Sequence, residues 1–195
     1  MSNMTQKWVN VLAPFSRNYY SKFSATELAK EMKIPQQTIS RYLNKLVRSN
    51  LIEYVRKGRN KLFYFDFSKT TSKILINIIE NQKALSFQIR LRKISLVVNE
   101  ILDVCGSMII FGSYAEGNFK NTSDLDILIF GKCNRKQVSK IKDKYVLEIN
   151  EHYISYLEFD KSLSENKPLA LEIMRNHVLF GDVSKIVDIF LNNKK

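Results

Sequence analysis

Two neighbouring stretches decide the fold of the C-terminal part: Ile109-Ile110-Phe111-Gly112-Ser113-Tyr114-Ala115-Glu116-Gly117, and then Ser123-Asp124-Leu125-Asp126-Ile127-Leu128. The apolar residues before Gly112 predict a strand that ends at this glycine, where the missing side chain lets a phosphate group approach the backbone. A helix that begins near Ser113 would direct free N–H groups at the same anion. The first stretch therefore predicts a phosphate-binding turn between a strand and a helix, to which the Ser113 hydroxyl adds a donor.

The second stretch carries two carboxylates at the start of another predicted strand. Asp124 and Asp126 are two residues apart, so their side chains project to one face of that strand. Two carboxylates held this close repel each other unless a cation lies between them. Oxygen ligands of this kind suit Mg²⁺, with Mn²⁺ as an alternative. The pair therefore predicts a metal site next to the phosphate-binding turn.

The spacing of these groups resembles the signature of the DNA polymerase beta superfamily of nucleotidyltransferases: Gly112-Ser113, ten residues, and then Asp124-Leu125-Asp126. Over residues 106–181 the chain also looks like the minimal nucleotidyltransferases, at Ala115, Gly117 and Ser123. The resemblance implies that Gly112 and Ser113 bind the nucleotide and that the aspartates hold two Mg²⁺ ions. The implied reaction transfers a nucleoside monophosphate from an NTP to an acceptor hydroxyl of a protein, an RNA or a small molecule. Minimal members are often encoded beside a helical toxin, so a toxin-type protein partner is also implied.

The superfamily usually adds a third carboxylate from a neighbouring strand, which completes metal binding and helps to deprotonate the acceptor hydroxyl. The next predicted strand, 145–157, contains Glu148 and Glu151. We predict Glu151 as the third catalytic and metal-binding residue. Glu148 in this role, or no third acid, are the alternatives, because either glutamate alone can be a solvated strand residue.

Four more residues are predicted to have roles other than those of the aspartates. Tyr114 and Glu116 lie inside the motif and are candidate nucleotide contacts. His152 and His177 have no partner at metal-ligand spacing, which favours structural roles for both.

The positive charge of the chain is concentrated at its N-terminal end. Residues through Ser68 include 12 Lys and Arg against 4 Asp and Glu, a net charge of +8 out of the +12 of the whole chain. This density of positive charge attracts polyanions through counterion release, and nucleic acid is the commonest such partner. Solubility is the alternative explanation.

Three short helices and a β-hairpin are predicted in this basic part. One helix begins at Thr5, a second begins at the capping-box pair Ser24 and Glu27 and breaks at Lys33, and a third follows Pro35. Apolar segments at 51–55 and 62–67, separated by a basic turn, predict the hairpin. This order resembles the winged helix-turn-helix regulators over residues 4–68, with the hairpin as the wing.

The winged-helix resemblance implies DNA binding by the outward-facing residues of the third helix and by the basic residues of the wing. The expected contacts are Gln36, Gln37, Ser40, Arg41 and Asn44 on the helix, and Arg56, Lys57 and Arg59 at the wing. Winged domains also mediate protein contacts, which is the alternative function for this part.

Apolar residues at helical spacing from Thr71 to Cys105 predict one long or two shorter helices between the two parts. Several of their faces are too apolar for solvent, so this connector packs on a domain or pairs with a second copy in a homodimer. The predicted class is α+β in two domains. It comprises a winged helix of three helices and a hairpin (1–68), a helical connector (69–105) and a small mixed-sheet α/β nucleotidyltransferase domain (106–195).

The last of these domains has further predicted elements. Strands are expected at 108–111 and 125–130, and helices at 135–144, 169–180 and 183–191.

Cysteine usage and the N-terminal residues bear on localisation. Cys105 and Cys133 are the only cysteines and lack CxxC spacing, which predicts two reduced thiols. Residues 1–10 lack the apolar core of a signal peptide, and no apolar run approaches the ~18 residues of a membrane span. We therefore expect a cytoplasmic protein without a membrane partner.

Two functions of different classes fit these patterns. The first is an Mg²⁺-dependent nucleotidyltransferase with an attached DNA-binding winged helix. The alternative is a DNA-binding transcription regulator or antitoxin-like protein, whose nucleotidyltransferase fold senses a nucleotide or holds a partner without catalysis. The open identity of the third acid supports the alternative.

Overall fold

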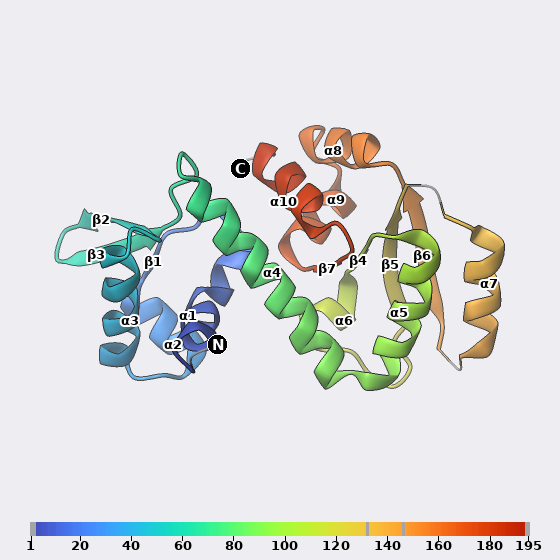
Figure 1. The fold of residues 1–195 in the computed structure, drawn as a ribbon, viewed down its shortest axis with the longest axis horizontal. Helices are drawn as coiled ribbons and strands as arrows, with labels where there is room; N and C mark the ends of the chain where they lie inside the picture. Colours follow the sequence, from blue (N-terminus) through green and yellow to red (C-terminus); the bar gives the residue numbers. More distant parts are fainter. Residues whose placement is uncertain (1–2, 132, 146, 194–195) are drawn as a thin grey trace. The chain divides into compact units, whose positions relative to one another are not determined.

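The computed structural model describes residues 3–131, 133–145 and 147–193, without the side chains of residues 3–6. The chain divides into two compact units between Ile79 and Glu80. Each unit contains helices and its own small β-sheet (Figure 1). The predicted α+β class with two domains is therefore confirmed.

The helices of the first unit begin and end where the sequence predicts, within a few residues. The predicted helices are α1 (Asn3–Leu12), α2 (Ala25–Met32) and α3 (Gln36–Arg48), whereas the 3₁₀ helix η1 (Ala13–Arg17), which follows α1, was not predicted. The Ser24 hydroxyl accepts a hydrogen bond from the backbone N–H of Glu27, and the Glu27 carboxylate accepts one from the backbone N–H of Ser24. This capping box starts α2, and Lys33, in the left-handed conformation (φ 55°), ends it.

Helix α3 is held in the first unit by one apolar face. Its side chains Ile39, Leu43 and Leu46 are fully buried, whereas Gln36 and Arg41 on other faces are exposed. Burial at spacings of three and four residues is typical of an amphipathic helix that packs one face on a small core. The outer face of α3 is thus free of core contacts.

A three-stranded antiparallel sheet completes the first unit. It consists of β1 (Phe23–Ser24), β2 (Glu53–Lys57) and β3 (Asn60–Tyr64), in the order β1-β3-β2. Arg56 pairs with Lys61 and Lys57 with Asn60, so the hairpin turn is Gly58-Arg59. Both strands therefore lie closer to the turn than the predicted segments 51–55 and 62–67. Two of the basic residues expected in the turn, Arg56 and Lys57, belong to β2. Gly58, with φ 61°, supplies the left-handed residue that this tight turn requires.

The predicted connector consists of two helices, α4 (Thr70–Arg90) and α5 (Arg92–Cys105). In the second unit, Ala84 and Phe87 of α4 join the hydrophobic core. Helix α5 buries a full face in the same core through Ile94, Val97, Val98 and Ile101. The faces that the sequence identified as too apolar for solvent are therefore partly covered by this unit.

The second unit is built on a four-stranded mixed sheet. Its strands are β4 (Met108–Ile110), β5 (Leu125–Phe130), β6 (Ile149–Ile154) and β7 (Val178–Phe180), in the order β6-β5-β4-β7. Strand β5 is parallel to β6, and β4 is antiparallel to both β5 and β7. Odd-numbered residues of β5 pack in the core with α5 and α7 (Arg135–Lys144). The even-numbered residues therefore lie on the opposite face.

The remaining helices are α6 (Gly112–Glu116), α8 (Tyr156–Ser164), α9 (Pro168–Arg175) and α10 (Val183–Asn192). The predicted helix at 169–180 is wrong in its second part, because residues 178–180 form β7 and pair with β4. Helix α8 was missed, although Ser155 and Glu158 form the capping box that starts it. The predicted strand at 145–157 is too long and overlaps the start of this helix, because β6 ends at Ile154.

Cys105 and Cys133 form a disulfide, so the prediction of two reduced thiols is wrong in this structure. Cys105 ends α5, and Cys133 lies between β5 and α7. Their Cα atoms are 4.4 Å apart, although 28 positions separate them in the sequence. Sequence spacing gave no sign of the pairing, because the packing of α5 beside the sheet brings the two residues together.

Candidate active site and candidate nucleic-acid interface

The two aspartates of the motif lie at the start of β5. Asp124 immediately precedes the strand and Asp126 is its second residue, and both are half-buried. Leu125 and Ile127, which alternate with them, are fully buried in the core. The aspartates therefore share the face of the sheet that α5 and α7 do not cover, as the spacing predicted.

Both carboxylates converge on the side chain of Asn150. The Asn150 amide nitrogen donates to Oδ2 of Asp124 at 3.2 Å and to Oδ1 of Asp126 at 3.3 Å. The parallel pairing of β5 and β6 sets this arrangement, because it places Asp126 directly beside Asn150. One amide group can reach both carboxylates only if their oxygens face a common point.

Gly112, at the start of α6, lies against the second aspartate. A Cβ atom added to Gly112 would lie 2.5 Å from Oδ2 of Asp126, and the φ angle of Gly112 is 63°. The backbone N–H of Phe111 also donates to the carbonyl of Asp126 at 3.1 Å. The sequence predicts a glycine here because a phosphate approaches the backbone. The structure adds a second reason, since a side chain at Gly112 would occupy the space of the Asp126 carboxylate.

The segment between the turn and the aspartates is closed by hydrogen bonds. The Ser113 carbonyl accepts from the backbone N–H groups of Gly117 at 2.9 Å and Asn118 at 3.2 Å, which ends α6. The Ser123 hydroxyl accepts from the backbone N–H of Lys120 at 2.8 Å, and the Ser123 N–H donates to the Lys120 carbonyl at 3.0 Å. These bonds hold the chain in a turn immediately before Asp124.

Tyr114 and Glu116, the other motif residues considered for nucleotide contact, both have protein partners. Tyr114 is buried, and its ring stacks on Phe119 with centroids 4.5 Å apart. Burial raises the pKa of the Tyr114 hydroxyl, and the charge of Asp124 acts in the same direction. Glu116 is exposed and accepts from the amides of Asn118 at 2.8 Å and Asn176 at 3.1 Å.

Glu151 does not join the aspartates. It pairs with Ile127 in the sheet register and forms an ion pair with Lys142 of α7, on the opposite face from Asn150. Glu148 precedes β6 and is exposed, and its backbone carbonyl accepts from the N–H of Leu125 at 2.8 Å. Within the described ranges, no group of three or more His, Cys, Asp and Glu side chains could hold a metal ion. The placement of Glu151 thus disagrees with its predicted role.

Asn150 was not predicted as a site residue, because the superfamily resemblance implied a carboxylate on this strand. The alternation along this strand carried a usable signal, since Ile149 and Tyr153 are apolar and mark the core face. Asn150 and His152 then belong to the other face, with the aspartates. The pattern along β6 therefore indicates Asn150 as the polar side chain nearest the aspartates.

The two histidines lie in different surroundings. His152 is exposed, and its ring lies 6.0 Å from that of Phe111. His177 is fully buried, with Nδ1 3.1 Å from the carbonyl of Ile173 and Nε2 3.2 Å from the carboxylate of Glu80. Burial lowers the pKa of His177, as does the charge of Lys83, whereas Glu80 and the Ile173 carbonyl act in the opposite direction.

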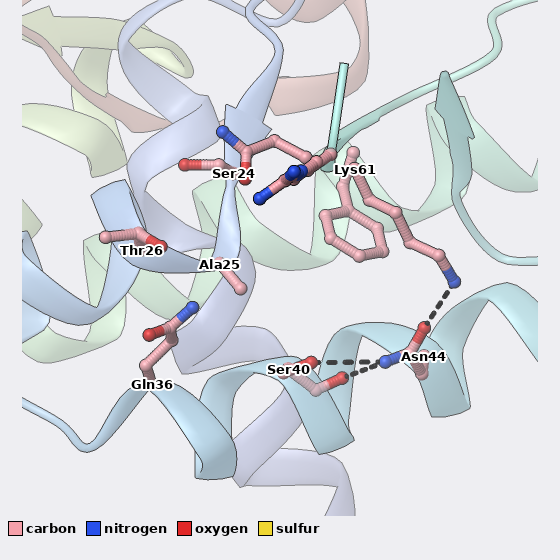
Figure 2. A pocket seen from close by; sticks show the side chains of 10 residues that line it. Ser24, Ala25, Thr26, Gln36, Ser40, Asn44 and Lys61 are labelled. Carbon is pink, nitrogen blue, oxygen red and sulfur yellow. Dashed lines mark hydrogen bonds between the residues drawn. The ribbon is translucent and has the colours of Figure 1, made fainter. Parts of the chain in front are cut away.

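A cleft of about 280 Å³ lies between the start of α2, helix α3 and the wing of the first unit (Figure 2). Its polar lining includes four of the residues predicted to contact DNA. These are Gln36, Ser40, Asn44 and Arg59. Gln37 and Arg41 of α3, and Arg56 and Lys57 of β2, are exposed but do not line the cleft.

Asn44 connects the helix and the wing across this cleft. Its amide nitrogen donates to the carbonyl of Ser40 at 2.8 Å and to the Ser40 hydroxyl at 3.2 Å. Its carbonyl oxygen accepts from Nζ of Lys61 at 3.1 Å (Figure 2). Lys61 also lies over the ring of Tyr54, 4.2 Å from its centroid. Asn44 therefore holds Lys61 in the cleft, a residue that was not among the predicted DNA contacts.

A model of the nucleotidyltransferase domain matches residues 91–191, just over half of the chain. The chain belongs to the nucleotidyltransferase domain family. The matched residues include α5, all four strands of the second sheet, both aspartates and Asn150. A model of the MarR family matches residues 2–61. The predicted fusion of a winged helix with a nucleotidyltransferase domain is thereby confirmed.

One solved structure similar to the chain is that of a candidate nucleotidyltransferase from Sulfolobus solfataricus, at 24% sequence identity. The similarity covers 50% of this chain and 86% of that protein, with a TM-score of 0.31. No curated protein matches the chain.

Two further predictions concern surfaces. In the described ranges, no helix combines the length and the apolar character needed to cross a membrane. Helix α4 exposes Ile74, Ile78, Leu85 and Ile89. Pairing with a second copy through such residues stays a prediction, as does a helical toxin-type partner.

Proposed function

We propose that this nucleotidyltransferase domain is catalytic and transfers a nucleoside monophosphate from an NTP to an acceptor hydroxyl in an Mg²⁺-dependent reaction. The observation that carries the proposal is the convergence of Asp124 and Asp126 on one point, next to Gly112. Membership of the nucleotidyltransferase domain family supports the reaction class.

The donor set fits a divalent cation. Two carboxylates whose oxygens lie within 3.3 Å of one amide group are spaced to chelate a cation at that point. Such oxygen ligands are those that Mg²⁺ and Mn²⁺ prefer. Asp124 and Asp126 would hold the metal, which when bound neutralises charge on the triphosphate and on the reacting oxygens.

The chain's own residues have distinct tasks in this proposal. The backbone of Gly112 and the hydroxyl of Ser113 hold the phosphates, because the turn between β4 and α6 lies beside the Asp126 carboxylate that would hold the metal. With Glu151 on the opposite face, the proton of the acceptor hydroxyl passes to the aspartates. The acceptor belongs to a protein, an RNA or a small molecule.

The winged-helix unit is proposed to bind DNA. The support is its basic composition, the MarR family match and the polar cleft between α3 and the wing. In this proposal, Gln36 and Ser40 meet base edges, while Arg59 and Lys61 meet phosphates. In this account, the winged helix localises the transferase near nucleic acid.

A second function is favoured by one observation: the side chain that meets both aspartates is the amide of Asn150 and not a third carboxylate. A regulator that binds DNA and nucleotide without transfer would tolerate this replacement. The two functions differ in whether the chain forms a product.

The proposal is tested by incubating the full chain with each α-phosphate-labelled NTP and Mg²⁺ or Mn²⁺, together with RNA and protein extract. We expect label on an acceptor, lost in Asp124→Asn and in Asp126→Asn but kept in Glu151→Gln. Unchanged thermal unfolding of the variants would show that they fold. Label that persists in both aspartate variants would contradict the proposed mechanism, and no label with the wild type would favour the regulator.

A further inference from the structure

The Asn150 amide occupies the position at which the two carboxylates converge. Its nitrogen lies 3.2 Å from Asp124 and 3.3 Å from Asp126, and its register partner is Asp126 itself. An amide N–H₂ group carries partial positive charge and donates two hydrogen bonds. Without a cation, it therefore relieves the repulsion between two half-buried carboxylates.

The same side chain can serve a bound cation in the opposite orientation. Rotation of the terminal amide by half a turn exchanges its nitrogen and oxygen, which costs little because this torsion is broad. The carbonyl oxygen would then face the point that the nitrogen now faces. Amide oxygens are ordinary ligands of divalent cations in proteins.

An amide at this position changes the charge of the site. Two carboxylates and one amide carry a formal charge of −2, whereas three carboxylates would carry −3. The number of charged ligands is one of the features that tune cation affinity. A cation that enters must also displace the two hydrogen bonds that Asn150 donates to the aspartates. Compared with a site of three carboxylates, both effects weaken the binding of a cation in the absence of nucleotide.

We propose that Asn150 is a neutral ligand of the site, and that because of it the divalent cation binds together with the nucleoside triphosphate rather than before it. This inference rests on the proposed function. The triphosphate supplies the negative charge that Asn150 does not. Neither nearby glutamate supplies this negative charge, because Glu151 is paired with Lys142 on the other face and Glu148 lies before the strand.

Binding of Mn²⁺ to the full chain tests this ligand role without any reaction. Equilibrium dialysis gives the affinity for Mn²⁺ alone in the wild type and in Asn150→Asp, which keeps the size of the side chain. We expect Asn150→Asp to bind Mn²⁺ at least about tenfold more tightly, because it adds a full charge at ligand distance. Asn134→Asp is the control, since it adds the same charge at the N-cap of α7, where aspartate also caps well.

The coupling between cation and nucleotide is the second readout. Fluorescent α,β-methylene analogues of the four NTPs report nucleotide affinity with and without Mn²⁺. In the wild type, we expect Mn²⁺ to raise analogue affinity strongly, and by linkage the analogue raises Mn²⁺ affinity by the same factor. In Asn150→Asp this factor should fall, because the cation already binds to the free protein.

The outcomes separate this inference from the proposed function. Equal Mn²⁺ affinity of the wild type and Asn150→Asp, with binding lost in Asp126→Asn, would overturn the role of Asn150 and leave the metal site intact. Undiminished Mn²⁺ binding by Asp126→Asn in the presence of the analogue would overturn the metal site and the proposed function together. Tighter binding by Asn150→Asp but not by Asn134→Asp supports the inference.

Discussion

A Cβ atom at Gly112 would lie 2.5 Å from Oδ2 of Asp126, so the glycine of the turn and the second carboxylate occupy adjoining space. Gly112 also has a φ of 63°, a conformation that side chains disfavour. The two constraints have separable consequences. The backbone constraint concerns the stability of the fold, whereas the contact concerns the position of the carboxylate.

Gly112→Ala should therefore damage activity more than stability. We expect unfolding free energy to fall by about 1–2 kcal/mol, from the left-handed backbone. Transfer activity should fall at least about a hundredfold, because the methyl group displaces the Asp126 carboxylate and small misplacements are this costly. Chemical denaturation and the labelled-NTP assay measure the two effects.

Gly131→Ala is the matched control for this substitution. Gly131 has a φ of 76°, and a Cβ atom there would meet nothing within 4 Å. It should show the same loss of stability with nearly full activity. Equal activity losses at both positions would mean that backbone strain, and not the contact with Asp126, explains the effect.

Glu151→Gln should leave transfer nearly unchanged, because Glu151 faces Lys142 and not the aspartates. The lost ion pair is partly exposed, so we expect unfolding free energy to fall by about 0–1 kcal/mol. Steady-state transfer rates and urea denaturation check both expectations. A loss of transfer comparable to that of Asp124→Asn would restore Glu151 as a catalytic residue.

Lys61→Met should weaken DNA binding, because Asn44 and the ring of Tyr54 hold the Lys61 ammonium in the cleft. Removal of one phosphate contact should reduce the slope of log affinity against log salt by about 1. Fluorescence anisotropy with the full chain and a short duplex measures this slope.

Lys30→Met provides the control for DNA binding. Lys30 is exposed on α2 and does not line the cleft, yet its substitution removes the same charge. We expect its slope to stay closer to that of the wild type. Equal changes for Lys30 and Lys61 would indicate binding through overall charge and not through the cleft.

His177 should make the second unit sensitive to acid. Burial lowers the pKa of this residue in the folded chain, so the unfolded chain binds the proton first, at a pKa of about 6.5. Stability is therefore complete above this pH and is lost as the pH falls below it, by at most about 1.4 kcal/mol per pH unit.

Substitution of His177 by glutamine tests this dependence. Unfolding free energies from urea titrations at several pH values should fall less steeply below about pH 6.5 for His177→Gln than for the wild type. The charged groups facing His177 are Glu80 and Lys83 of α4, and both remain in the variant. Parallel curves would show that His177 does not carry the effect.

The sequence predicted the elements that local patterns specify. The capping box at Ser24, the helix after Pro35 and the strand at 125–130 appear in the structure with nearly the expected bounds. Asp124 and Asp126 share a face for the same local reason, since the side-chain period of a strand is two. Local periodicity was thus enough to predict that both aspartates lie on the same face of the strand.

Features that depend on contacts between distant segments were missed. Residues 178–180 are apolar enough for either a helix or a strand, and pairing with β4 decides for the strand. Asn150 meets the aspartates only because β6 pairs with β5 in one register, and a shift of one residue would have placed Glu151 there. The disulfide of Cys105 with Cys133 likewise depends on packing and not on spacing.

The most direct measurement of the central claim compares two labels on the same NTP, one at the α-phosphate and one at the γ-phosphate. Nucleotidyl transfer by the site of Asp124 and Asp126 should place the α label on the acceptor and release the γ label in pyrophosphate. Asp126→Asn should abolish both signals. The γ label on the acceptor, or neither label on it with the α label in free nucleotide, would contradict the account.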